Sequence, residues 1–314
     1  MSNSKKAGDV ICEELITAAT ANPDILAVTS DSRGSASLSP FADQLPDQLI
    51  EMGIAEQNSV TVSAGLAHSG KRPFTFSPAA FLSARSIEQV KVDVTYSNTN
   101  VKLVGISGGN SYSVLGNTHH SLQDLATTRA LPNLQVYMPA DRAQTQGLMR
   151  YLVKSDLPAY IRIGKKALTD VYDSTEVAFK GPGKANLVVD NGDDITLLAA
   201  GETVAIAVDA ATELKQRGIQ AKVVDLVSVK PIDKEMINAV ADATHRFVTI
   251  EEHSTIGGLG SAVAEVVAPR GDTKVDFVGF PDAPAIAGAQ DEVFKYYGID
   301  TQDIADRVEK LLKA

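Results

Sequence analysis

Cysteine, tryptophan and long apolar runs are scarce or missing in this chain of 314 residues. Cys12 is the single cysteine, which excludes an internal disulfide and is typical of a reducing compartment. Tryptophan is absent and aromatic residues make up 5% of the chain, while Ala, Gly and Ser are abundant, as in helices packed closely onto sheets. No run of about 18 apolar residues occurs, so we expect no membrane-spanning helix.

Basic charge is also in deficit. The formal net charge is −10 at pH 7, which argues against nucleic acid or an anionic membrane as a partner, because both bind basic surfaces. A few local arginines could still bind a phosphorylated substrate. The first ten residues, MSNSKKAGDV, lack the apolar segment of a signal peptide, so we expect a cytoplasmic protein. The histidines and Cys12 show no metal-ligand spacing, which predicts no metal site carried by this chain alone.

Short apolar runs alternate with helix-like segments along most of the chain. ILAVTS (25–30) and VKLVGIS (101–107), for example, read as buried strands. This alternation predicts an α/β fold of two doubly wound domains with mainly parallel sheets. The polar, glycine-containing stretch 167–194 is the expected linker between a first domain, 1–166, and a second domain, 195–314.

One carboxylate opens a helix-like segment that is otherwise small and apolar. Glu56 lies in EMGIAEQNSVTVSAGLAHSG (51–70), where one interpretation is that it complements the helix dipole. A second unusual feature is the pair His119 and His120, which follows Gly-Asn-Thr in a loop before the next helix. A solvated loop explains the histidines by themselves, but together with Glu56 they indicate a functional site.

Four stretches, in this order, resemble the C-terminal half of transketolase. They are GIAEQN, GNTHHSLQDLATTRALPNLQVYMPAD, AYIRIGKK and TLLAAGETVAIAVDAATELKQRGIQAKVVDLVSVKPID, and the similarity runs over nearly the whole chain. The chain is also similar to 1-deoxyxylulose-5-phosphate synthase. This resemblance implies a thiamin diphosphate enzyme, of which the chain would be the pyrimidine-binding domain and the C-terminal domain.

A further domain of such enzymes binds the cofactor's diphosphate through Mg²⁺ and carries a G-D-G motif followed by asparagines. The Gly-Asp pairs of this chain lack that context. The chain therefore resembles the small subunit of a split transketolase. The resemblance implies a large partner subunit that holds the diphosphate and Mg²⁺. It also implies that two of the present chains pair within an α2β2 tetramer, with the C-terminal domain serving mainly dimerisation and stability.

The resemblance also implies which residues bind the cofactor. Glu56 would hydrogen-bond a ring nitrogen of the aminopyrimidine in a mostly apolar setting and thereby favour its imino tautomer. Ile54 would line the pocket that holds the cofactor bent. In PFTFSPAAFLSARSIEQV, Phe81 is the best match to the aromatic ring that stacks on the aminopyrimidine, and Phe76 is the second.

Substrate residues follow from the same resemblance. His119 would meet substrate hydroxyls or the developing alkoxide. Arg162 would hold the phosphate end of the sugar, and Arg33 lies near the place of a second such arginine. One position departs from the family: Leu115 replaces an aspartate that contacts a sugar hydroxyl. We therefore expect an altered sugar preference, for a ketose with a different terminal oxyanion or a branched chain.

The implied activity is the transfer of a two-carbon ketol unit from a ketose, phosphorylated in the usual case, to an aldose. Two other interpretations stay open. One is a subunit like 1-deoxyxylulose-5-phosphate synthase or the beta subunit of a 2-oxo acid dehydrogenase, which would decarboxylate pyruvate or a relative of it. The other is a non-catalytic regulatory partner, against which the presence of Glu56 speaks.

Overall fold

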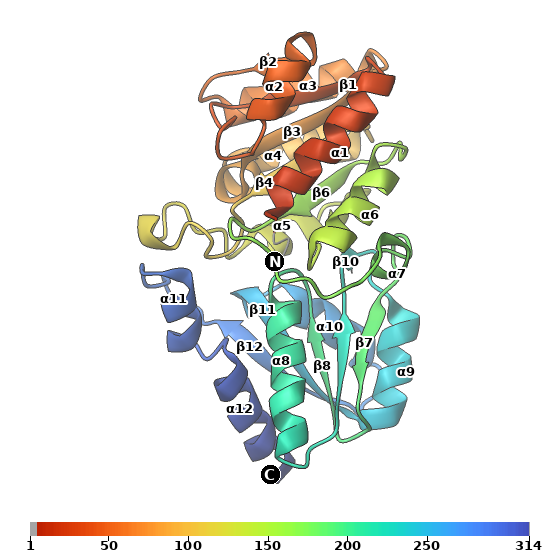
Figure 1. The fold of residues 1–314 in the computed structure, drawn as a ribbon, viewed down its shortest axis with the longest axis vertical. Coiled ribbons are helices and arrows are strands. Elements are labelled where there is room, and N and C mark those ends of the chain that lie inside the picture. Colours follow the sequence, from red (N-terminus) through yellow and green to blue (C-terminus); the bar gives the residue numbers. More distant parts are fainter. Residues whose placement is uncertain (1–4, 314) are drawn as a thin grey trace.

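Residues 5–313 form two α/β units stacked along the long axis of the molecule in this computed structural model (Figure 1). The first unit is built on a seven-stranded sheet and the second on a five-stranded sheet. The predicted fold class, two α/β domains with mainly parallel sheets, is confirmed.

The seven-stranded sheet of the first unit has the order β10-β5-β6-β4-β3-β1-β2. All of its pairings are parallel except that between β10 and β5. The strands are β1 (Ile25–Thr29), β2 (Leu49–Glu51), β3 (Arg72–Pro78), β4 (Lys102–Ile106), β5 (Gln135–Tyr137), β6 (Ala159–Arg162) and β10 (Ser228–Lys230).

Helices cover both faces of this sheet. They are α1 (Ala7–Ala21), α2 (Ser39–Gln44), α3 (Glu56–His68), α4 (Ile87–Gln89), α5 (Asp124–Arg129) and α6 (Arg142–Leu152), with the 3₁₀ or π-helical segments η1 (Pro46–Gln48), η2 (Phe81–Arg85), η3 (Val90–Tyr96) and η4 (Ser113–Leu115). Helices α1 and α6 pack together on one face, where they bury Val104 of β4. The neighbouring Leu103 points to the other face and packs with Val60 of α3. Alternate strand residues therefore enter two separate cores.

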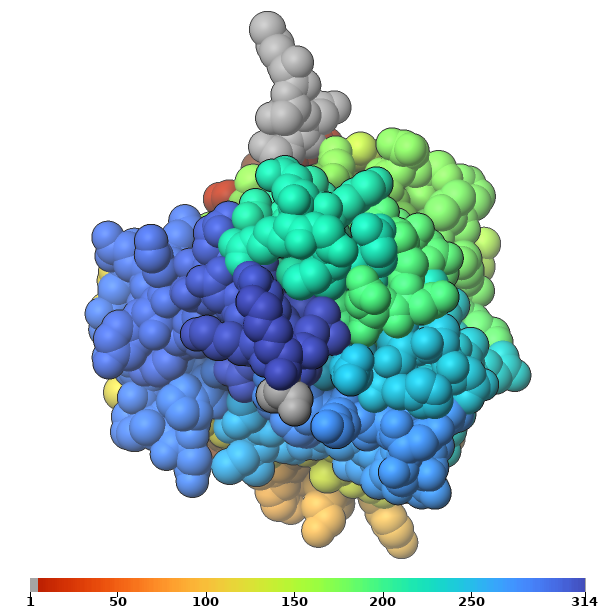
Figure 2. All heavy atoms as spheres, turned by 90° about the horizontal axis from the view of Figure 1, so that it is seen from below, coloured from red at the N-terminus to blue at the C-terminus, as the bar shows by residue number. Residues whose placement is uncertain are grey.

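The five-stranded sheet of the second unit has the order β12-β11-β8-β9-β7, and only the edge strand β7 is antiparallel. Its strands are β7 (Asn186–Asp190), β8 (Ile195–Ala199), β9 (Ala221–Asp225), β11 (Arg246–Ser254) and β12 (Lys274–Phe280). Its helices are α8 (Thr203–Gln216), α9 (Lys234–Thr244), α10 (Leu259–Val267), α11 (Gln290–Tyr296) and α12 (Thr301–Lys313). Seen from below, α12 (dark blue) lies beside α8 (teal) (Figure 2).

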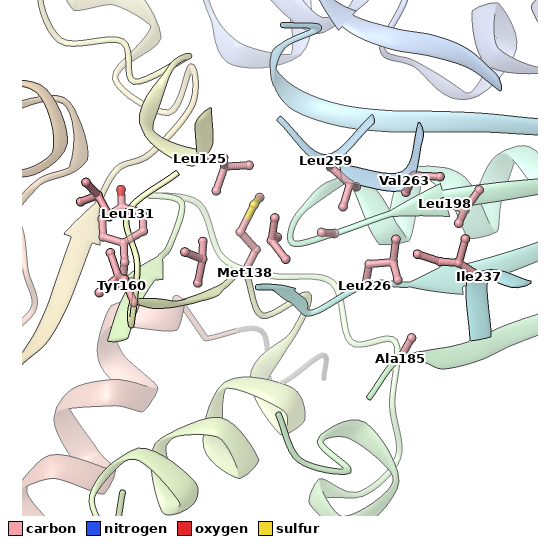
Figure 3. Close-up of a cluster of buried hydrophobic side chains, with 14 of the residues drawn as sticks. Leu125, Leu131, Met138, Tyr160, Ala185, Leu198, Leu226, Ile237, Leu259 and Val263 are labelled. Atoms are coloured by element: carbon pink, nitrogen blue, oxygen red, sulfur yellow. The ribbon is translucent and has the colours of Figure 1, made fainter. Parts of the chain in front are cut away.

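The two units share a hydrophobic core. Met138 and Leu125 from the first unit meet Leu226, Leu259 and Val263 from the second in one continuous cluster (Figure 3). Buried apolar surface of this kind, at about 25 cal/mol per Å², favours a fixed arrangement of the units.

The structure differs from the expected linker, 167–194, in the C-terminal part of that stretch. It contains helix α7 (Thr175–Ala178) and also β7, which is a strand of the second sheet. Conversely, β10 lies in the second half of the chain but pairs with β5 of the first sheet. A three-residue strand carries too little pattern to indicate which sheet it joins. Within residues 5–313, no helix has the length and apolarity needed to cross a bilayer.

Candidate active site

The candidate site lies where the parallel strands of the first sheet end. Glu56 begins α3, which follows β2, and its side chain is 5% exposed. Gly53 adopts a positive φ of 68° in the turn before the helix, a conformation that glycine takes without strain. The carboxyl ends of parallel strands are the usual place for ligand sites in α/β sheets.

Arg85 contacts the Glu56 carboxylate from the segment after β3, and Phe81 of the same segment packs against Arg85. Nη1 of Arg85 donates a hydrogen bond to Oε2 of Glu56 at 2.8 Å. The same guanidinium lies over the Phe81 ring, with Cζ 4.2 Å from the ring centroid. Because Phe81 and Arg85 are four residues apart at the two ends of the helical turn η2, their side chains share one face. A planar cation is thus held between an aromatic face and a buried carboxylate.

His119 completes this group from the loop between β4 and α5. Its ring lies edge-on to Phe81, with centroids 5.3 Å apart, and edge-on to Tyr112 at 5.7 Å. Nδ1 of His119 is 3.0 Å from the hydroxyl of Thr118. The imidazole is therefore oriented by two aromatic edges and one hydroxyl.

Lys165 extends the row of side chains after the end of β6. Its Nζ lies 5.0 Å from the centroid of the Tyr112 ring, and its side chain is exposed. A small pocket of about 90 Å³ adjoins it, lined among others by Lys6, Ser35 and Ser107. Two amines and three serine hydroxyls around one hollow form an environment suited to an oxyanion.

The structure thus brings three of the predicted residues together, namely Glu56, Phe81 and His119. Ile54 lies two residues before Glu56 and is 76% exposed, so its role as a cofactor contact stays a prediction. Arg33 is exposed in the segment after β1, one residue before the pocket-lining Gly34, and its substrate role likewise stays a prediction.

Phe76 does not lie in the site. It is fully buried and belongs to the core beneath α1 and α6, together with Phe74 of the same strand. Thr75 between them faces α3, where its hydroxyl donates to Ser63 at 2.7 Å. Strand residues alternate between faces, so Phe76 points away from the side on which Glu56 lies. This contradicts the prediction that Phe76 stacks on the cofactor.

Arg162 is also placed differently from the prediction. Its side chain is 2% exposed, and its Nη2 donates to the Glu252 main-chain oxygen at 2.6 Å and to Oε2 of the Glu252 side chain at 3.1 Å. Although burial alone would lower the pKa of Arg162, the carboxylates of Asp124 and Glu252 raise it above its ordinary value. A guanidinium enclosed between the two units cannot reach a dissolved sugar phosphate, which contradicts the predicted phosphate role.

Two residues of the site were not predicted from the sequence. Arg85 stands four residues after Phe81 in FLSAR, a spacing that places both side chains on one face of a helical turn. Tyr112 lies in the glycine-rich segment GGNSYSV, where an aromatic residue is a signal for binding. Among residues 5–313, no three histidine, cysteine or acidic side chains are arranged to ligate a metal ion.

Two stacked α/β units, with a buried carboxylate and an aromatic ring at the strand ends of the first, are the arrangement expected for a pyrimidine-binding domain followed by a C-terminal domain. The chain belongs to the transketolase family. The pyrimidine binding domain of transketolase matches residues 5–170, and the transketolase C-terminal domain matches residues 183–304. The resemblance seen in the sequence is thereby confirmed.

Curated relatives include subunits of split transketolases. The chain is 46% identical over 301 residues to one of the subunits of the apulose-4-phosphate transketolase of Phocaeicola vulgatus, covering 96% of each chain. It is 37% identical over 296 residues to a 6-deoxy-6-sulfo-D-fructose transketolase subunit of Clostridium sp. (strain MSTE9), covering 94% of this chain and 91% of the relative. The 1-deoxy-D-xylulose-5-phosphate synthase 1 of Geobacter sulfurreducens is 34% identical, and the match covers 47% of its length.

A solved structure supports the same comparison. A split gene transketolase described as an inactive beta4 tetramer superposes with a TM-score of 0.88 at 36% identity, with 99% of each chain covered. The chain is therefore similar over nearly its whole length to a chain of a split gene transketolase.

Proposed function

We propose that this chain is the small subunit of a thiamin-diphosphate-dependent transketolase. A large partner subunit supplies the diphosphate and Mg²⁺ site, and the complex transfers a two-carbon ketol unit from a ketose to an aldose. The membership of the transketolase family and the similarity to a single subunit of a split enzyme support this proposal.

The observation that carries the proposal is the place of the Arg85 guanidinium. It is a planar group with N–H donors, lying on the Phe81 face and hydrogen-bonded to Glu56. An aminopyrimidine is also planar and, when its ring nitrogen is protonated, presents an N–H donor. The two residues present therefore fit that ring, because they already hold a group of the same shape and polarity.

Each residue then has a defined task. Glu56 accepts a hydrogen bond from the ring and fixes its protonation, while Phe81 supports the ring from one face. Thiamin diphosphate, when bound, supplies the carbanion chemistry of ketol transfer. His119 offers Nε2 to a substrate hydroxyl, and the exposed Ile54 is an apolar neighbour for the bent cofactor. Side chains that orient reacting groups in this way raise the reaction rate, because they hold those groups in a reactive geometry.

A residue other than Arg162 must bind the anionic end of the sugar. We assign it to Lys165, beside the small pocket, with Arg33 as the second cation. Leu115 is 51% exposed in η4, four residues before His119, and cannot accept a hydrogen bond from a sugar hydroxyl. The expected donor is therefore a ketose outside the usual pentose and heptose phosphates, in line with the substrates for which the relatives from Phocaeicola vulgatus and Clostridium are named.

The proposed assembly is an α2β2 tetramer in the cytoplasm. Two of the present chains pair, and each active site forms between a small and a large subunit. The solved split gene transketolase is named as an inactive beta4 tetramer, which supports only the part of this proposal in which small subunits associate with one another.

A ketol-transfer assay tests the proposal. The chain would be assayed alone and with its candidate large subunit, thiamin diphosphate and Mg²⁺, against phosphorylated, sulfonated and unmodified ketoses. Activity should require the partner and should fall by about 10²- to 10⁴-fold in Glu56→Ala, the range for loss of an acid–base group. Glu88→Ala removes an exposed carboxylate near the site and serves as the control. Carbon dioxide released from pyruvate would favour the synthase or dehydrogenase alternative, and inactivity of every combination without cofactor binding would favour a regulatory partner.

A further inference from the structure

The loop 107–123, between β4 and α5, presents Tyr112 and His119 to the site and contains only short turns. Within it, Gly109 and Ser121 exchange two backbone hydrogen bonds of 3.2 and 2.7 Å. The short turn η4, backbone bonds from His119 and His120 to the Gly116 oxygen at 2.9 and 3.1 Å, and a contact from His120 Nε2 to the Ser113 oxygen at 2.9 Å add to its internal bonding. A segment of this length needs further contacts to keep one conformation.

Some of these contacts come from the first unit, as from the N–H of Gly108 to the oxygen of Ile163 at 2.9 Å, and others come from the second unit. Oε1 of Glu252 accepts a hydrogen bond from the backbone N–H of Asn110 at 2.8 Å and another from Nε2 of Gln290 at 2.9 Å. Further along the loop, the N–H of Ser254 donates to the oxygen of Leu122 at 2.9 Å. Strand β11 thus holds the loop at both ends, with Glu252 at the end nearer to Tyr112.

Arg162 fixes the Glu252 carboxylate from the opposite side. Its Nη2 donates to both the main chain and the side chain of Glu252, while its Nε lies 3.6 Å from Oδ2 of Asp124. Asp124 is the first residue of α5, directly after the loop. Asp124 directly follows the loop and Glu252 belongs to the second unit. The enclosed guanidinium of Arg162 therefore links the C-terminal end of the loop to the second unit. A buried guanidinium with contacts to two acidic residues and a main-chain oxygen has little freedom of orientation.

Two glycines show how closely the loop lies on this pair. A Cβ atom at Gly108 would stand 2.4 Å from Nε of Arg162, and one at Gly109 would stand 1.9 Å from Nη2 of Arg162 and 2.3 Å from Cδ of Glu252. No side chain larger than hydrogen fits at either place without displacing the ion pair or the loop. The backbone of the loop therefore rests directly on Arg162 and Glu252.

We propose that Glu252, held by Arg162, is a positioning residue for catalysis, which sets the loop 107–123 so that His119 faces the substrate. The proposal rests on the proposed function for the identity of the reaction. It assigns the second unit a part in the active site through the loop, in addition to its share of the common core. Glu252 itself touches neither substrate nor cofactor.

The first test measures the loop directly and needs no activity. Amide hydrogen exchange of the full chain would be compared for wild type, Glu252→Ala and Glu251→Ala. Glu251 is the matched control, because it is a buried carboxylate of the same strand but accepts from Leu259 and Gly260 at the start of α10. We expect Glu252→Ala to speed exchange in peptides covering 108–121 by at least about tenfold. Glu251→Ala should speed exchange around α10 and leave the loop unchanged.

The second test uses the complex with the large subunit. Glu252→Ala should lower kcat by about 10- to 100-fold, the loss expected when a reacting group is displaced by about 1 Å. The affinity for thiamin diphosphate should stay within about threefold of wild type, because Glu56 and Phe81 lie outside the loop. Partial recovery of kcat in Glu252→Gln, which retains an acceptor for the Asn110 N–H, would distinguish a positioning role from loss of folding.

Two glycine variants keep the proposal testable if Glu252→Ala fails to fold. Gly109→Ala and Gly116→Ala both place alanine at a positive φ, 60° and 75°, in the same loop. A Cβ at Gly116 would meet only Ala287 Cβ, at 3.7 Å. Gly109→Ala should therefore lower kcat at least about tenfold more than Gly116→Ala. Equal losses in the two variants, or wild-type loop exchange in Glu252→Ala, would overturn the proposal. Loop exchange that changes as expected in a complex with no ketol transfer would instead refute the proposed function.

Discussion

Nη1 of Arg85 donates a hydrogen bond of 2.8 Å to Oε2 of Glu56. The Glu56 carboxylate is also the group to which the cofactor ring is proposed to bind. Arg85 must therefore leave before the ring can bind. Because the Arg85 side chain is 45% exposed, its ion pair contributes no more than about 1 kcal/mol. Arg85→Ala should then bind thiamin diphosphate about two- to fivefold more tightly in the complex, as measured by titration calorimetry.

Arg85→Lys is the control for this variant, since it retains the charge but lacks the planar fork that lies on Phe81. Weaker cofactor binding in Arg85→Ala would mean that the guanidinium contacts the bound cofactor, and would contradict the exchange of partners at Glu56.

The two phenylalanines should respond in opposite ways to truncation. Phe76→Ala opens a cavity in a closed core and should destabilise the chain by about 3–5 kcal/mol in chemical unfolding. Phe81→Ala, at a partly exposed ring, should lower stability by no more than about 1.5 kcal/mol but weaken cofactor binding by about tenfold. The opposite order of the two effects would restore Phe76 as the stacking residue.

Leu115→Asp tests the basis of sugar preference. An aspartate at this position could accept a hydrogen bond from a substrate hydroxyl, which is worth about 1.5 kcal/mol, or about tenfold in kcat/KM. We expect kcat/KM to rise by this factor for common pentose or hexose phosphate donors and not for the best native donor. Val114→Asp adds the same charge to the neighbouring exposed residue of η4 and is the control. An unchanged preference in Leu115→Asp would count against the role of this residue.

Asp225, at the end of β9, should make stability depend on pH. Burial raises the pKa of Asp225 to about 7, and its Oδ2 accepts from Gln144 Nε2 at 2.7 Å and from the Tyr172 hydroxyl, with the charge of Asp141 nearby. The folded state therefore keeps a proton that the unfolded chain releases near its ordinary pKa of about 4. The free energy of unfolding should fall as pH rises between these values, by no more than about 1.4 kcal/mol per pH unit.

Chemical unfolding at pH 4.5, 5.5, 6.5 and 7.5 measures this slope. Asp225→Asn should reduce it, whereas Asp209→Asn, which removes an exposed carboxylate from α8, should leave it unchanged. A slope that survives unaltered in Asp225→Asn would place the retained proton on another group.

Strong local patterns made much of this structure predictable from the sequence. Apolar runs gave the parallel sheets, and Glu56 at the head of a small-residue helix indicated the site, because both signals lie within about ten neighbouring residues. Strand alternation also predicts the face that holds Phe76, because it places Phe76 with Phe74 and opposite Thr75, whereas the aromatic motif alone predicts the site.

The buried environment of Arg162 could not be predicted from local sequence patterns. Its partner Glu252 is 90 residues away in the chain, and the same AYIR pattern would describe a strand whose arginine faces solvent. Burial that depends on the packing of two units follows from tertiary contacts, which no local period encodes. The ion pair between Arg85 and Glu56 has the same origin, since it joins segments 29 residues apart.

Strand β10 has a consequence for how the chain matures during synthesis. It pairs with β5 at the edge of the first sheet, although it emerges from the ribosome only after β7, β8 and β9 of the second sheet. Until then, the nascent first unit carries an unpaired edge at β5, which is open to pairing with a neighbouring chain. The growing chain should therefore need protection of that edge until β10 is made. A truncated product that ends before residue 228 should aggregate more readily than the full chain.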